Sequence, residues 1–430
     1  MANICVTGIW HQGTVVSACL ADLGNNVYGI CDDRETAMSL NAGQIPVYEP
    51  ELPDIVRNNI EAGRLRYTTD YSKGIRGAGF VFICTDTPVD INDESDLSSI
   101  YSIAEKIGQH LDKDIILCVT AQVPIGTSVE LSRIVRSLSP IYRGAVAYVP
   151  EFLRLGIAVE TFRQADRFVI GCNDPGIADC VAALYKPLGR PIIYTDIRSA
   201  EMAKHASNTF LATSISFINE IANLCEAVGA NALEVAKILK LDRRIGKYAF
   251  LSPGLGFTGG TLGREIRALQ KIGSTYQVPT PLMDAVWHIN ANRVQLVNHR
   301  LSTLLGTLKG HQIGILGLTY KAGTSTLRRA ISLKIISDLV KQRAKIKAFD
   351  PLANLSEVSS LPPMQICSDP YEVAKGSSAI VLVTEWIGLN DLDFKRLNIN
   401  MKGDIFLDTR NLLDPIKMKE AGFRYFGIGR

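Results

Sequence analysis

Short apolar runs alternate with amphipathic stretches through the first half of the chain. The run at 3–8 predicts a buried strand, and a turn then leads to a helix over roughly 14–23. Gly24 suits the C-terminal cap of that helix, and a second strand is predicted over 27–31. This order of strand, turn, helix and strand is typical of a parallel sheet covered by helices.

The same alternation continues to residue 195. Further strands are predicted at 79–85, 115–120, 145–150, 168–172 and 191–195. Helical stretches separate several of these strands. The pattern therefore predicts an α/β fold with a doubly wound, mostly parallel sheet.

The pattern changes after residue 198. Apolar residues recur at helical spacing through 199–231, which predicts a long helix of the kind that forms a domain backbone or a dimer interface. Loops rich in Gly and Pro follow at 252–263, and another helix is predicted over roughly 280–305.

Near residue 311 the first pattern returns. Strands are predicted at 311–320, 345–351, 378–386 and 404–411, with a helix at 330–342. The C-terminal part therefore predicts a second Rossmann-like domain. We expect domain boundaries that give a first Rossmann-like domain at 1–198, a central helical domain at 199–305 and a C-terminal domain at 306–430.

Composition and charge narrow the classes of function. The formal net charge of +3 is too small to indicate nucleic acid or a membrane surface as partner. No run approaches the ~18 apolar residues that a spanning helix needs. The first residues enter a strand directly, so we expect no signal peptide. The 9 cysteines lack metal-ligand spacing, so no metal is predicted, and a reducing, cytoplasmic setting is expected.

The first strand-to-helix turn contains Gly8 and Gly13, with Trp10 at the middle position. A GxGxxG turn binds a pyrophosphate because its glycines allow close backbone approach and the helix N-terminus attracts anions. With Trp10 in the middle, the motif alone is equally compatible with a plain strand-to-helix turn.

The second strand of such a domain normally ends in an acid that binds the ribose hydroxyls. Here that position is Cys31, and Asp32 follows it. Asp32, one residue after the usual position of the acid, can bind the ribose hydroxyls. Arg34 can instead face a ribose phosphate, which would favour NADP. Both can equally be solvated turn residues.

Several segments, in order along nearly the whole chain, make the sequence resemble the UDP-glucose/GDP-mannose dehydrogenase family. They are LNAGQIPVYEPEL (40–52), TDTP (85–88), QVPIGT (122–127), PEFLRLGIAVE (150–160), SAEMAKHASNTFLATSISFINEIANLCE (199–226), LDRRIG (241–246), SPGLGFTGG (252–260), GLTYKAGTSTLR (317–328), TEW (384–386), DTRN (408–411) and GIGR (427–430). No one segment is decisive, but the ordered set is specific.

The resemblance implies an N-terminal domain that binds NAD, a C-terminal domain that binds a nucleotide sugar, and a central helix that builds a homodimer. The family oxidises the 6-hydroxymethyl of the sugar to a carboxylate with two NAD. A cysteine captures the intermediate aldehyde, and water cleaves the thioester that the second hydride transfer produces. The implied partner of this chain is a nucleotide sugar, most simply a UDP-hexose.

The resemblance assigns catalysis to the pair Lys204 and Asn208, which are four apart and share one helix face. Such fixed donors hold a sugar oxygen and stabilise its developing charge. Glu151 matches an acid near the reacting carbon, where it would act as a base or orient water. A surface lysine, a helix-face amide and a strand-end acid are the plain alternatives.

Further positions match family contacts. The implied substrate contacts are Glu151, Phe152, Leu153, Lys204, Asn208, Arg244, Phe250, Leu251, Ser252, Pro253, Gly254, Gly256, Lys321 and Arg410. The implied cofactor contacts are Gly8, Trp10, Gly13, Asp32, Thr87, Gln122, Arg264 and Arg328. For each one, an ordinary surface or core role is the alternative.

Several positions depart from the family pattern. The family run G-F-G-G-S-C-F-P-K-D aligns here with residues 256–265, which places Thr261 where the family has its catalytic cysteine. Arg264 and Glu265 replace the Lys and Asp of that run, Gln122 replaces a threonine and Leu155 a glutamate. A threonine hydroxyl needs a neighbouring base to attack a carbonyl, whereas a thiolate does not.

Three hypotheses follow from these departures. The first is an NAD(P)-dependent nucleotide-sugar oxidoreductase that lacks the covalent cysteine step and stops at the aldehyde or reaches the acid by another route. The second is a redox-neutral epimerase that keeps its NAD. The third is a catalytically silent protein that binds a sugar nucleotide. We favour the first, because the polar positions Lys204, Asn208 and Glu151 are kept together.

Overall fold

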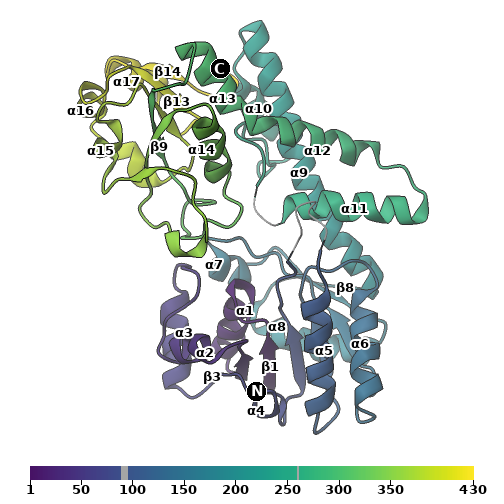
Figure 1. Cartoon of the computed structure of the whole chain (residues 1–430). Coiled ribbons are helices and arrows are strands. Elements are labelled where there is room, and N and C mark those ends of the chain that lie inside the picture. Colours follow the sequence, from purple (N-terminus) through teal and green to yellow (C-terminus); the bar gives the residue numbers. More distant parts are fainter. Residues whose placement is uncertain (89–94, 259–260) are drawn as a thin grey trace. The chain divides into compact units, whose positions relative to one another are not determined.

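The computed structural model describes residues 1–88, 95–258 and 261–430. These residues form two compact units, Met1–Ser207 and Asn208–Arg430. Each unit contains one sheet with helices around it (Figure 1). The three-domain division at 198 and 305 stays a prediction.

The first unit is built on a sheet in the order β3-β2-β1-β4-β5-β6-β7-β8. Its strands are β1 Asn3–Thr7, β2 Asn26–Ile30, β3 Leu65–Thr68, β4 Phe80–Ile83, β5 Ile116–Val119, β6 Val146–Tyr148, β7 Phe168–Gly171 and β8 Ile192–Thr195. Its helices are α1 His11–Asp22, α2 Arg34–Asn41, α3 Leu52–Glu61, α4 Tyr71–Ile75, α5 Ser98–His110, α6 Thr127–Leu138, α7 Ala158–Arg163 and α8 Pro175–Tyr185, followed by the 3₁₀ turn η1 Lys186–Leu188.

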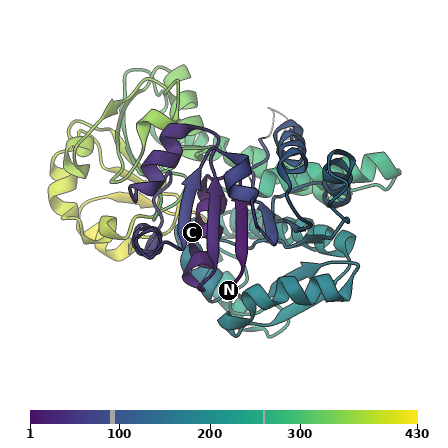
Figure 2. The ribbon, with the colours of Figure 1, turned by 90° about the horizontal axis from the view of Figure 1, so that it is seen from below.

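Neighbouring strands of this sheet run parallel except for β6 and β7, which are antiparallel. Seen from below in Figure 2, the strands β1 and β2 run side by side among the helices. Separate hydrophobic cores form on the two faces of the sheet, one centred on residues such as Val15 and Leu20 of α1, the other on Ile103 and Ile107 of α5. The apolar runs of the inner strands β1, β4 and β5 are buried between these cores, as a sheet covered on both faces requires, whereas the edge strand β8 is partly exposed.

The helix α9, Ile197–Val228, carries the chain from the first unit into the second. In the second unit the helices are α10 Ala232–Leu241, α11 Leu262–Tyr276, α12 Pro281–Arg293, α13 Gln295–Leu305, α14 Ile331–Lys341, α15 Pro370–Ala374, α16 Phe394–Ile399 and α17 Pro415–Glu420. The strands β9 Gln312–Leu316, β10 Lys345–Phe349, β11 Gln365–Ile366, β12 Ala379–Leu382, β13 Ile405–Asp408 and β14 Arg424–Phe426 form a parallel sheet in the order β11-β10-β9-β12-β13-β14. The 3₁₀ turns are η2 Leu355–Glu357 and η3 Ile387–Asp391.

Two predictions about helices were wrong. The helix predicted over 280–305 is two helices, α12 and α13, which meet at Val294. Helices α10 and α11 were not predicted, and α11 begins at Leu262 inside the predicted loop at 252–263. The glycines around the start of α11 hid its amphipathic repeat, because glycine is typical of loops.

The first helix begins earlier than predicted. It starts at His11 rather than near residue 14, so the turn after β1 is only three residues long. Gly24 adopts a φ of +88°, which confirms the predicted cap of this helix. The short turn brings the helix N-terminus close to the end of β1, where a dinucleotide pyrophosphate binds in folds of this kind.

Candidate functional site

The turn between β1 and α1 requires glycine at both ends. Gly8 has a φ of +76°, and a Cβ there would lie 2.4 Å from the backbone of Thr85. A Cβ on Gly13 would lie 2.3 Å from the carbonyl oxygen of Gly8. Both glycines therefore have the tight-turn and close-packing roles that they have in dinucleotide-binding turns.

Trp10 occupies the middle position of this turn, and its backbone conformation does not require glycine. Its φ is −131°, and its amide donates to the carbonyl of Gly8 at 3.0 Å. Its own carbonyl accepts from the amide of Thr14 at 3.2 Å and from the Thr14 hydroxyl. The half-buried indole lies edge-on to the ring of His11, at 6.3 Å between centroids. The turn thus keeps the shape of a dinucleotide turn and adds a bulky side chain.

The three side chains that follow β2, Cys31, Asp32 and Asp33, have different environments, which bear on which of them can bind the ribose. The thiol of Cys31 is buried, and burial raises its pKa to about 12, so it cannot replace a carboxylate. Asp33 caps α2 by accepting from the amide and the hydroxyl of Thr36, each at 2.7 Å, and these bonds lower the pKa of its carboxyl. Asp32 is exposed. Among these three side chains, Asp32 therefore stays the predicted ribose ligand.

Two other predicted cofactor residues lie together at neighbouring strand ends. The hydroxyl of Thr87, after β4, donates to the backbone carbonyl of Gln122, after β5, at 2.9 Å. Gln12, which the sequence did not single out, joins this edge of the sheet from α1, since its side-chain amide donates to both oxygens of Thr120 at 3.1 Å. The edge formed by the carboxyl ends of the strands is the usual binding edge of an open α/β sheet.

The predicted catalytic residues of the first unit form a compact group. The ammonium of Lys204, on α9, is buried, donates to the backbone carbonyl of Glu151, and lies 3.9 Å from its Oε1. It also lies 4.9 Å from the ring centroid of Phe152. The other carboxylate oxygen of Glu151 accepts from the amide of Leu153 at 2.6 Å. The carboxylate and the ammonium are therefore both held in fixed positions.

Asn208 lies one helical turn after Lys204 on α9. Its side chain is buried, and its Nδ2 has no hydrogen-bond partner among the described residues. A buried amide donor that is left without a partner is costly in a protein interior, and a ligand oxygen bound there would satisfy it.

The structure also identifies a positioning residue that the sequence did not. Glu201 is fully buried on α9 and accepts from the amides of Gly126 and Ser128 at 2.6 and 3.1 Å and from the Ser128 hydroxyl at 2.7 Å. These donors belong to the N-terminal end of α6. Glu201 therefore fixes α9, and with it Lys204, against the sheet of the first unit.

In the second unit, three side chains hold the predicted substrate loop around residues 250–258. Asn219 accepts from the amide of Gly254 at 2.8 Å, and Asn290 bonds both the amide and the carbonyl of Phe257, at 2.8 and 2.9 Å. The guanidinium of Arg293 donates twice to the carbonyl of Gly254, at 3.0 and 2.6 Å. A Cβ on Gly256 would lie 2.3 Å from Oδ1 of Asn290, so glycine is required there.

Arg293 is a buried cation that the sequence did not reveal. It is 3% exposed, and it also donates to Oδ1 of Asn223 at 2.8 Å. Burial, helped by the positive charge of Arg300, lowers the pKa of Arg293 to about 10. No local sequence signal marks it, because its contacts come from α9 and the loop, far away in the chain.

Thr261 precedes the first residue of α11. Its side chain is exposed and makes no capping hydrogen bond to that helix. Arg264 and Glu265, in the first turn of α11, are buried. The residue at the position where the resemblance places the family's catalytic cysteine is thus a solvent-accessible hydroxyl at a helix N-terminus. Gly259 and Gly260, part of the resembling segment, lie outside the described residues.

Three other predicted contacts of the second unit are arginines in separate ion pairs. Arg410 lies 3.1 Å from Glu385 and donates to the carbonyl of Val383 at 2.6 Å. Arg328 lies 3.5 Å from Glu357. Arg244 is exposed and pairs with Asp242 at 2.6 Å, which raises the pKa of the guanidinium. Lys321 is half-buried. Each of these three arginines thus has an acid of its own as partner.

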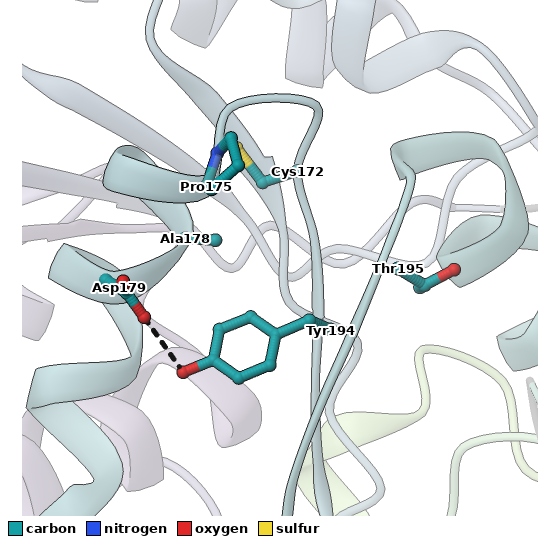
Figure 3. A pocket seen from close by; sticks show the side chains of 6 residues that line it. All are labelled: Cys172, Pro175, Ala178, Asp179, Tyr194 and Thr195. Carbon is teal, nitrogen blue, oxygen red and sulfur yellow. Dashed lines mark hydrogen bonds between the residues drawn. The ribbon is translucent and has the colours of Figure 1, made fainter.

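A surface hollow of about 360 Å³ lies elsewhere in the first unit. It is formed by α8 and the edge strand β8, and Figure 3 shows the Tyr194 hydroxyl donating to Asp179, at 3.2 Å. The sheet order places β8 at the far edge from β1. The residues that line the hollow include none of the predicted site residues.

Together, the turn, the strand-end residues and the two sheets define a dinucleotide-binding α/β protein of the dehydrogenase class. Comparison with protein families agrees. Residues 2–189 match the NAD-binding domain of the UDP-glucose/GDP-mannose dehydrogenase family, residues 198–292 its central domain and residues 314–415 its UDP-binding domain. The chain therefore belongs to the UDP-glucose/GDP-mannose dehydrogenase family, and its cofactor is NAD.

Individual relatives cover the full chain. The chain is 37% identical to the UDP-glucose 6-dehydrogenase TuaD of Bacillus subtilis, over 100% of this chain and 94% of that protein. It is 35% identical to a UDP-glucose 6-dehydrogenase of Pseudomonas aeruginosa, over 100% of this chain and 97% of that protein. A UDP-glucose dehydrogenase structure from Pyrobaculum islandicum superposes with a TM-score of 0.92 at 28% identity, covering 100% of this chain and 98% of that one. The predicted fold class is confirmed.

No helix within the described parts of the chain combines the length and the apolar character that crossing a membrane demands.

Proposed function

We propose that this protein is an NAD-dependent oxidoreductase that removes hydride from the 6-hydroxymethyl of a UDP-hexose without a covalent cysteine intermediate. In the first oxidation the C6–H bond breaks, the hydride reduces NAD to NADH, and the hydroxyl proton leaves to a base or to water. The product of that step is the 6-aldehyde. NAD supplies the hydride acceptor, and the protein supplies the base and the oxygen-binding donors.

The observation that carries this proposal is the fixed pair of Lys204 and Glu151. The buried ammonium can donate to the sugar oxygen, where negative charge develops as the hydroxyl loses its proton. The Glu151 carboxylate, 23% exposed at its side chain, is near enough to solvent to pass a proton on. Asn208 supplies a second donor, and its Nδ2 has no protein partner within the described residues.

The proposed absence of a thioester step rests on Thr261. The hydroxyl of an exposed threonine is a poor nucleophile unless a base activates it. Leu155 replaces a family glutamate, and Gln122 replaces a family threonine that positions the catalytic water. Together with Thr261, these changes remove several of the groups that the family uses to form the acid. The two outcomes left are release of the aldehyde, or oxidation of its hydrate by a second NAD.

UDP-hexose is proposed as the substrate for two reasons. The C-terminal part matches a UDP-binding domain, and full-length relatives are named UDP-glucose 6-dehydrogenases. In the second unit we assign the nucleotide sugar to the loop that Asn219, Asn290 and Arg293 hold, with Lys321 and Arg410 as further contacts.

We also propose a homodimer that forms through α9. This helix carries four exposed apolar residues at spacings of seven, seven and four. They are Phe210 (70% exposed), Phe217 (46%), Leu224 (58%) and Val228 (77%). Residues at this spacing share one helix face. An apolar stripe that a lone chain leaves in water is typical of a subunit interface.

The test combines UDP-glucose, NAD and pure protein, and it follows NADH by absorbance while mass spectrometry identifies the sugar product. A UDP-galactose arm is the matched control for the sugar. We expect NADH formation and no adduct on any cysteine. The product should be either the aldehyde, which hydroxylamine traps as an oxime, or the acid formed without an adduct. Four-electron turnover with a thioester on a cysteine would overturn the proposed mechanism.

Other outcomes select the other hypotheses. Conversion of one UDP-hexose into another without net NADH would indicate an epimerase. Failure to bind NADH at millimolar concentration would indicate a silent sugar-nucleotide-binding protein, in which Trp10 closes the turn to the pyrophosphate.

A further inference from the structure

Glu49 is a fully buried carboxylate in the segment between α2 and α3. Its Oε2 accepts from Nε2 of His11 at 2.8 Å and from the amide of Gly156 at 3.0 Å. Its Oε1 accepts from the amide of Ala158 at 2.5 Å. A buried carboxylate is expensive unless donors surround it, and these three donors meet that need.

The donors come from two separate parts of the proposed site. His11 is the first residue of α1 and follows Trp10 in the dinucleotide turn. Gly156 and Ala158 lie at the end of the loop that begins with Glu151 and at the start of α7. One oxygen atom of Glu49 therefore bonds the cofactor turn on one side and the loop of the catalytic acid on the other.

The anchoring of α7 does not depend on Glu49 alone. At the other end of this helix, Arg163 pairs with Glu51 and with Asp22 of α1, each at 2.9 Å. These side chains are 38–59% exposed, and they tie the end of α7 to α1 and to the residue that precedes α3. The buried contact through Glu49 touches both functional segments.

We propose that Glu49 is a positioning residue that couples dinucleotide binding at the β1–α1 turn to the order of the Glu151 loop. A dinucleotide on the turn restrains His11, His11 restrains the carboxylate, and the carboxylate restrains the amides of Gly156 and Ala158. The loop that carries the acid and Phe152 is thus fixed when the cofactor is bound. This inference rests on the proposed NAD site, and it adds a connection from that site to the catalytic loop.

The test is hydrogen exchange of the full-length protein with and without saturating NADH. NADH should slow exchange in the peptide covering residues 154–162 by at least about fivefold, the lower end of ordinary coupling between sites. In His11→Ala, which removes the link and leaves the Glu49–amide bonds in place, the NADH effect should fall below about twofold. Glu51→Gln is the matched control, and it should keep the full NADH effect.

A purely structural Glu49 gives a different result. If Glu49 is purely structural, His11→Ala changes the exchange rate of residues 154–162 equally with and without NADH. The ratio of the two exchange rates then stays at its wild-type value. That outcome overturns the coupling and leaves the proposed function standing. The same conclusion follows if the wild-type protein binds NADH by fluorescence but its exchange rates without and with NADH have a ratio near one. Absence of NADH binding overturns the proposed function, and the coupling with it.

Discussion

The Lys204 ammonium donates to the backbone carbonyl of Glu151, so the two predicted catalytic residues of the first unit are joined through the main chain. The carboxylate of Glu151 lies 3.9 Å away and does not form the short contact itself. Removing the carboxylate therefore leaves the lysine in place, and the two residues can be tested independently.

Lys204→Ala should lower kcat for NADH formation from UDP-glucose by about 10²–10³-fold, because it removes a donor to the developing oxyanion. Glu151→Gln keeps the carbonyl that holds Lys204, and we expect a loss of about 10²-fold from the missing base. Both variants should bind NADH as the wild type does. A rate in Lys204→Ala close to that of the wild type would remove lysine from the mechanism.

Thr261→Cys should place a reactive thiol at the N-terminus of α11, where the helix lowers the pKa of a thiol. Iodoacetamide should label the thiol introduced at position 261 at least about tenfold faster than the exposed Cys180 of the wild type. During turnover of UDP-glucose the variant should show an enzyme adduct by mass. Thr261→Ser is the control, and it should show none.

Arg293→Gln should raise KM for UDP-glucose by about tenfold, since the carbonyl of Gly254 loses two donors and the loop loses its fixed position. Affinity for NADH, measured by fluorescence, should stay unchanged. Arg293→Lys keeps one donor and should recover part of the effect. An equal change in NADH and UDP-glucose binding would indicate general destabilisation of the fold.

Phe217→Glu should dissociate the proposed dimer, because it places a charge in the exposed apolar stripe of α9. Sedimentation velocity at micromolar concentration should then show a monomer in place of a dimer. The exposed residue Met38, on α2, offers the control Met38→Glu, which should leave the assembly unchanged. A wild-type monomer would contradict the proposal outright.

Buried thiols predict a loss of stability at alkaline pH. Burial raises the pKa of Cys19, Cys31 and Cys84 to about 12, above the ordinary thiol value of 9.0. Thiols with a raised pKa in the folded state contribute stability that is complete below about pH 9 and is lost as pH rises toward about 12. The urea midpoint should therefore fall between about pH 9 and pH 10.5, and Cys31→Ala should make that fall shallower. An unchanged slope in the variant would show that Cys31 does not contribute.

The sequence by itself determined the local parts of the fold. The period of apolar residues marked the long helix α9 and the central strands of both sheets, because burial on a sheet or a helix face repeats along the chain. It missed β3, β11 and β14, which are two to four residues long and lie at the edges of their sheets. The sequence also predicted the roles of Gly8, Gly13 and Gly24 in the first turn and helix cap. These roles could be predicted because each backbone position excludes a side chain or needs a positive φ. The ordered motifs then identified the family.

Only the tertiary structure decided what the polar side chains do. It made Asp33 a helix cap, and it joined Glu49 to Gly156, 107 residues away. It also buried Arg293 against a loop 39 residues earlier in the chain. No local pattern encodes such contacts, because a buried polar group is satisfied by whichever donor or acceptor the packed fold brings within about 3 Å.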